Sequence, residues 1–66
     1  MSANVYDSLG EGYESAGKFD QATQKFQKAI EVGTKTDDQN LEQYKEHLKR
    51  VTAEANGASK KSPGHM

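Results

Sequence analysis

The sequence predicts an all-α protein, in which a helical hairpin is followed by a third, capping helix. Three observations lead to this expectation. Large apolar residues recur at spacings of three and four residues, which is the period of one helix face. The pattern breaks at Gly17 and again at Gly33, two residues of a type that commonly ends helices. A capping-box signal then opens a further periodic segment at Thr36. At 66 residues the chain has room for one small domain only.

The first helix is expected to run from Ala3 to Ala16 and to end at Gly17. Two glycines, Gly10 and Gly12, lie in its interior, where each costs about 1 kcal/mol relative to alanine. Packing must therefore hold this helix. Close approach of a second helix accounts for Gly10, since helix axes come within about 8 to 10 Å only where side chains are short. Nothing in the sequence accounts for Gly12.

The second helix is expected to begin near Phe19 or Asp20 and to stop at Gly33. The residues on the outward face of this helix are polar, so that face is expected to be solvated. The stripe predicted to be buried consists of Ala22, Phe26, Ala29 and Ile30.

The third helix is expected to start at the capping box formed by Thr36 and Gln39. A narrow apolar stripe follows on an otherwise charged segment, so this helix has only one face to bury. The stripe consists of Leu41, Tyr44, Leu48 and Val51. The predicted organisation is therefore a hairpin over 1–33, a connection and capping helix over 34–56, and a disordered tail over 57–66 that ends in a cloning scar.

The hairpin resembles a single tetratricopeptide repeat, a family defined by residue type and spacing over about 34 residues. The positions that carry the resemblance are Tyr6, Leu9, Gly10, Tyr13, Gly17, Phe19, Ala22, Phe26, Ala29 and Ile30. The proline usual after the second helix is absent, and Gly33-Thr34 stand there. The resemblance covers roughly half of the chain and implies an α-α superhelix type of fold. A narrower likeness, of NVYDSLGEGY, is to the repeat at the C-terminus of bacterial serine hydrolases of the esterase and β-lactamase-like kind.

The resemblance implies a protein-protein interaction module that binds a peptide along the concave surface of its first helices. The positions expected to be exposed on that surface are Asn4, Asp7, Ser8, Glu11, Glu14, Glu42, Gln43 and Glu46. The surface is acidic, so the expected partner is a basic peptide, although each exposed charge pair contributes only a fraction of a kcal/mol. The alternative interpretation is that these acids are ordinary solvated helix surface.

The second hypothesis is a structural, self-associating element, a homodimer that serves as the C-terminal appendage of a larger protein such as a hydrolase. A lone repeat leaves apolar surface without neighbours, and such surface is a ready interface. Exchange of the third helix through a flexible Gly33–Thr36 hinge is one route to such a dimer. The candidate contact residues are Val5, Val32, Leu41, Tyr44, Leu48 and Val51.

The residue pattern argues against several other functions. No catalytic motif surrounds Ser8, so no enzymatic activity is expected. His47 and His65 lack histidine or cysteine partners at metal-ligand spacing, so neither a metal site nor a cofactor is predicted. Nine Lys plus Arg against ten Asp plus Glu give no electrostatic signature for nucleic acid or an anionic membrane. With no signal peptide or membrane-spanning segment recognised, a soluble chain of unknown compartment is expected.

Overall fold

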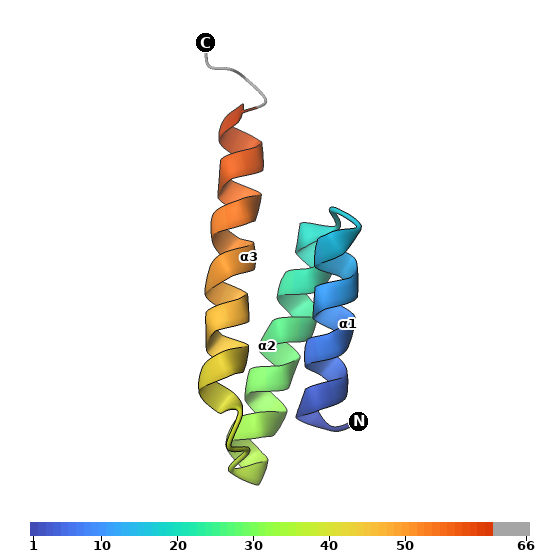
Figure 1. The fold of residues 1–66 in the computed structure, drawn as a ribbon, viewed down its shortest axis with the longest axis vertical. Helices are drawn as coiled ribbons and strands as arrows, with labels where there is room; N and C mark the ends of the chain where they lie inside the picture. Colours follow the sequence, from blue (N-terminus) through green and yellow to red (C-terminus); the bar gives the residue numbers. More distant parts are fainter. Residues whose placement is uncertain (62–66) are drawn as a thin grey trace.

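A computed structural model describes residues 1–61, and these form three helices and no strands. The helices are α1 (Ala3–Ser15), α2 (Phe19–Thr36) and α3 (Leu41–Lys61). As Figure 1 shows, α1 and α3 both run antiparallel to α2, and α3 extends beyond the end of the α1/α2 hairpin. The predicted all-α class, with a hairpin and a third helix packed on it, is confirmed.

The turn between α1 and α2 forms where the sequence places it. The side chain of Ser2 accepts a hydrogen bond from the Val5 amide at the start of α1. At the other end, Gly17 has φ +78°, and the Lys18 amide donates to the Tyr13 carbonyl at 2.9 Å. A left-handed glycine at this position reverses the chain without steric cost, so α1 and α2 become neighbours.

The hairpin is closed by a tight crossing at Gly10. A Cβ atom added to Gly10 would lie 2.6 Å from a ring carbon of Phe26, closer than side chains can approach. Phe26 is fully buried, with Ala22 and Val51 in the same apolar cluster. The interpretation of Gly10 as the close-approach residue is therefore confirmed. Gly12 differs, because nothing lies within 4 Å of the Cβ it lacks.

The second helix continues one turn beyond its predicted end. Gly33 is buried within α2, where an added Cβ would lie 3.2 Å from Leu41 Cδ1. The helix closes instead at Asp37, which adopts the left-handed conformation with φ 55°. The prediction that α2 stops at Gly33 is wrong, because this glycine provides close packing with α3 rather than a turn. The residues proposed as a flexible hinge for helix exchange, 33–36, are helical.

The third helix begins at Leu41, so the predicted capping box at Thr36 is also wrong. The Thr36 hydroxyl donates to the Val32 carbonyl at 3.0 Å, inside α2. Asp38 forms an Asx turn just before α3: its Oδ1 accepts from the Asn40 amide at 2.8 Å, and its Oδ2 accepts from the Tyr44 hydroxyl at 3.2 Å. Burial, aided by this bond to Asp38, raises the pKa of the Tyr44 phenol. The start of α3 lies five residues after the predicted capping residue Thr36.

The apolar stripe of α3 packs onto α2, as predicted for a capping helix. Tyr44 and Val51 are buried, and Leu41 and Leu48 are half-buried. The boundary expected at residue 56 is wrong, since the helix continues through Gly57 to Lys61. The Ala, Ser and Lys residues there can all continue a helix. Residues 62–66, with the suspected scar Gly64-His65-Met66, lie outside the described part of the chain.

Candidate functional site

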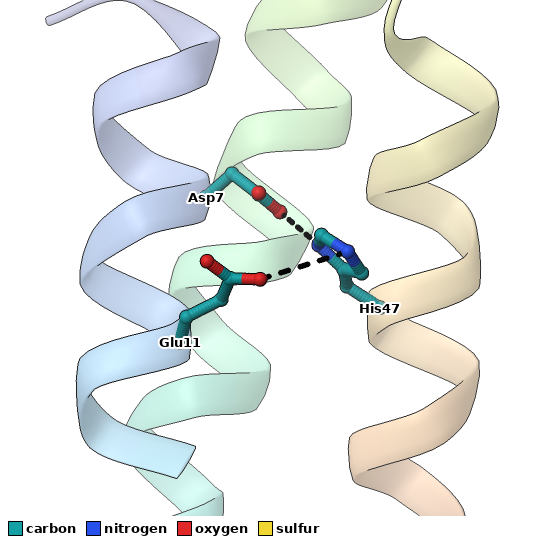
Figure 2. A group of neighbouring side chains, drawn as sticks. All are labelled: Asp7, Glu11 and His47. Atoms are coloured by element: carbon teal, nitrogen blue, oxygen red, sulfur yellow. Dashed lines mark hydrogen bonds and ion pairs between the residues drawn. The ribbon is translucent and has the colours of Figure 1, made fainter. Parts of the chain in front are cut away.

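One edge of α1 faces α3 and carries a group of titratable side chains. His47 Nδ1 lies 2.8 Å from Asp7 Oδ1, and His47 Nε2 lies 3.7 Å from Glu11 Oε2. Figure 2 shows the two carboxylates projecting from α1 toward the imidazole on α3. The side chains of Asp7 and His47 are only 11% and 12% exposed, whereas Glu11 is about half exposed. The contact is mainly a buried hydrogen bond between helices that both pack on α2.

A second pair links the same two helices one to two turns further along. Arg50 donates from Nε to Glu14 Oε2 at 2.8 Å and from Nη2 to Glu14 Oε1 at 2.5 Å. These bonds hold the pKa of Glu14 below its ordinary value of 4.5. They also raise the pKa of Arg50. Because bidentate pairs favour one orientation and distance, the Glu14–Arg50 pair adds a directional contact between α1 and α3.

Stability should depend on pH through the Glu14–Arg50 pair. A carboxyl whose pKa is lower in the folded chain stabilises it above the unfolded pKa, and this contribution is lost as the pH falls through the folded pKa. We therefore expect Arg50→Gln to lower the stability by about 1 kcal/mol near neutral pH. The difference from wild type should vanish well below pH 4.5, where Glu14 is protonated in both proteins. Thermal unfolding followed from about pH 6 to about pH 3 tests this.

The matched control for this experiment is Lys45→Gln, which removes an exposed pair on the same helix. Lys45 Nζ lies 3.6 Å from Glu42 Oε2, and both side chains are at least half exposed. This variant should stay within about 0.5 kcal/mol of wild type at every pH. A constant difference between Arg50→Gln and wild type across the whole pH range would contradict the role assigned to Glu14.

The expected concave acidic surface is only partly present. Asp7 is buried and Glu14 is mostly covered, because His47 and Arg50 of α3 pair with them. The expectation that these two acids are exposed is therefore wrong. Glu11 remains half exposed. The other positions predicted for that surface are exposed: Asn4, Ser8, Glu42, Gln43 and Glu46. Two of the acids counted as partner-binding thus serve contacts within the chain.

A different edge of α1 carries apolar side chains that the described part of the chain leaves partly uncovered. Val5 and Leu9 are 43% and 38% exposed. Beside them is a surface depression of about 350 Å³, with a largely apolar lining of Ser8, Leu9, Gly12, Tyr13, Ala16 and Lys18. We call this surface the α1 apolar face and define it by Val5, Leu9, Gly12, Tyr13 and Ala16. Their spacing places them on one side of the helix.

Most residues predicted for self-association are used within the chain instead. Tyr44 and Val51 are buried against α2, and Val32, Leu41 and Leu48 are half-buried in the same interfaces. They cannot be exposed contact residues while α3 stays docked. Val5 is the one predicted contact residue that is exposed. Val5 was among the contact residues expected from the sequence, whereas Leu9 was not.

Comparisons with family models, curated proteins and solved structures return no match for this chain. The structure itself shows the class of protein, which is a small all-α domain of three helices. Among residues 1–61, no helix is long and apolar enough to cross a membrane.

Proposed function

We propose that this chain is a protein-protein interaction module of the tetratricopeptide repeat type, which binds an apolar helix of a protein partner on the α1 apolar face. The observation that carries the proposal is the exposure of Val5 and Leu9 beside the open position at Gly12. Where exposed apolar side chains adjoin in one patch rather than lie scattered, they mark an interaction site.

Gly12 supports a helix as the occupant. Gly12 is one of the residues that line the depression, and nothing lies within 4 Å of the Cβ it lacks, so the backbone of α1 is open to a partner there. A second helix can approach closely at such a position, and on another side of α1 the Phe26 ring of α2 already packs against Gly10. Gly12 costs the isolated helix about 1 kcal/mol, and a partner helix would offset that cost.

The arrangement of polar groups favours an apolar partner over a basic peptide. Asp7 is already hydrogen-bonded to His47, and Glu14 is already paired with Arg50. No catalytic role is proposed, because Ser8 lines the depression while His47 is engaged by Asp7 on the side facing α3. The nearly balanced charge likewise supports a protein partner rather than nucleic acid or a membrane surface.

A fusion experiment tests the proposal without knowledge of the natural partner. A consensus tetratricopeptide repeat placed directly before Ser2 supplies a helix pair next to α1 and keeps the Ser2 cap. We expect one cooperative unfolding transition, at a higher temperature than that of the chain alone, since stacked repeats stabilise each other. Leu9→Lys should abolish this rise in unfolding temperature. Gln24→Lys, at an exposed position of α2, should leave the rise unchanged.

Two results would contradict this function. One is a fusion in which the two parts unfold independently. The other is an equal gain in the wild-type fusion and in the fusion that carries Leu9→Lys, which would mean that the α1 apolar face is not the contact. Circular dichroism of the Leu9→Lys variant alone serves as the folding control. Leu9 lies outside both buried clusters, so a lysine stem there can keep its ammonium in water and the helicity should be retained.

Self-association through the same face is the second candidate, and the exposure of Val5 and Leu9 favours it equally. A homodimer should show twice the chain mass by light scattering, and its melting temperature should rise with protein concentration. Leu9→Lys should return it to a monomer with its helicity unchanged. A monomeric mass at every concentration would leave the heterologous partner as the function.

A further inference from the structure

We propose that a divalent transition-metal ion of the Zn²⁺ class binds between α1 and α3, held by His47 Nε2 and the carboxylate of Glu11, with Asp7 orienting the imidazole. The sequence predicted no metal site, because it shows no histidine or cysteine pair at ligand spacing. The folded chain instead brings Asp7, Glu11 and His47 together from two helices, with one ligand atom of each within 4.8 Å of the others (Figure 2).

The hydrogen bond to Asp7 decides which ring nitrogen of His47 is available to bind a metal ion. Asp7 Oδ1 lies 2.8 Å from Nδ1 and is held in a mostly buried site, so Nδ1 carries the proton and donates it to the carboxylate. A neutral imidazole then has its lone pair on Nε2. Carboxylate partners of this kind fix the tautomer and orientation of metal-binding histidines and increase their basicity.

The free lone pair faces a second carboxylate at a distance that suits an intervening cation. Nε2 and Glu11 Oε2 are 3.7 Å apart, which is beyond hydrogen-bond length. At this distance the carboxylate oxygen and the imidazole nitrogen can share one cation, either a proton on Nε2 or a metal ion bound between them. Zinc bonds of about 2.0 to 2.2 Å place two ligands roughly 3.3 Å apart at a tetrahedral angle, and farther apart as the angle opens.

With two protein ligands, water would complete the coordination of the ion. The Glu11 side chain is about half exposed, so it can move the few tenths of an ångström that ideal coordination needs and leaves water access to the ion. An imidazole ligand favours zinc and its neighbours over magnesium or calcium, which prefer all-oxygen sites. The ion would join two helices that each pack mainly on α2, so its binding free energy would add to that of folding.

The test is thermal unfolding and calorimetric titration of the full chain with ZnCl₂ against a chelator. We expect one ion per chain and a melting temperature that rises with zinc concentration. Glu11→Gln should lower the affinity roughly tenfold or more, and Asp7→Asn should lower it by about 10- to 100-fold. His47→Gln should abolish binding. Cobalt substituted for zinc should give visible absorption bands that are lost in the same variants.

The controls separate this site from zinc bound elsewhere. Glu46→Gln removes an exposed acid next to His47, and His65→Gln removes the only other histidine, so both variants should bind zinc as the wild type does. The proposal is overturned if zinc leaves the melting temperature unchanged, if His65→Gln abolishes the effect, or if Glu11→Gln and Glu46→Gln behave alike. If His47→Gln fails to fold, the comparison of Glu11→Gln with Glu46→Gln still tests the site. Glu11 is half exposed, so its replacement should leave the chain folded.

Discussion

Gly10→Ala should destabilise the chain by roughly 1 to 3 kcal/mol, although alanine is the better helix former. The added methyl would lie 2.6 Å from Phe26 Cε1 and 2.7 Å from Cδ1. Phe26 is fully buried, so its ring can yield only by disturbing Ala22 and Val51 around it. For a domain of this size, such a loss lowers the melting temperature by several degrees per kcal/mol. Urea unfolding followed by circular dichroism measures it.

Gly12→Ala is the matched control, because it makes the same change in the same helix where nothing lies within 4 Å. It should stabilise the isolated chain by about 1 kcal/mol through helix propensity alone. In the fusion with a preceding repeat, Gly12→Ala should reduce the rise in unfolding temperature, because the added methyl would enter the proposed helix contact. Equal effects of the two substitutions on the isolated chain would contradict the crossing at Gly10.

Val51→Asp should have the largest effect of any single substitution predicted here. The Val51 side chain is 0% exposed and packs with Ala22 and Phe26. A carboxylate there loses the apolar contact and has no cation built to receive it, which costs several kcal/mol. A core of this size supplies only about 3 to 5 kcal/mol. We therefore expect α3 to detach and cooperative unfolding to disappear.

Ala53→Asp provides the comparison, since Ala53 is exposed on the same helix two residues away. It should change the free energy of unfolding by no more than about 0.5 kcal/mol. Urea titration and far-UV circular dichroism on both variants report this difference. A Val51→Asp variant that kept its stability within about 1 kcal/mol of wild type would contradict the docking of α3 against α2.

The contrast between Gly10 and Gly33 shows what a sequence can reveal about packing. Gly10 is predictable as a close-approach site, because large apolar residues surround it at helical spacings. Gly33 follows the same logic, but its polar neighbours suit a helix end equally well. The difference is that α3 returns to pack against Gly33, with Leu41 Cδ1 at 3.2 Å from its missing Cβ. That contact depends on the path of the chain after α2.

The site residues show the same limit more clearly. Helical spacing places Asp7 and Glu14 beside Glu11 on one helix edge, and that pattern alone predicts three exposed acids. The burial of Asp7 depends on His47, 40 positions further along the chain, and that of Glu14 depends on Arg50, 36 positions further along. The periodicity of α3 predicts its apolar stripe but not its register against α1. One signal was present: His47 and Arg50 are three residues apart, so they share one edge of α3.

The sequence by itself determined the helical class, the turn at Gly17, the apolar faces of the three helices and the small residue at the first crossing. These follow from periodicity, glycine conformation and side-chain volume, which act over a few residues. Only the tertiary structure decided that α2 extends to Thr36, that Asp38 begins the turn into α3, and that Asp7, Glu11 and His47 share one site. Each of these depends on where α3 lies against the hairpin. That position is set by the combined packing of Tyr44 and Val51, which no local pattern specifies.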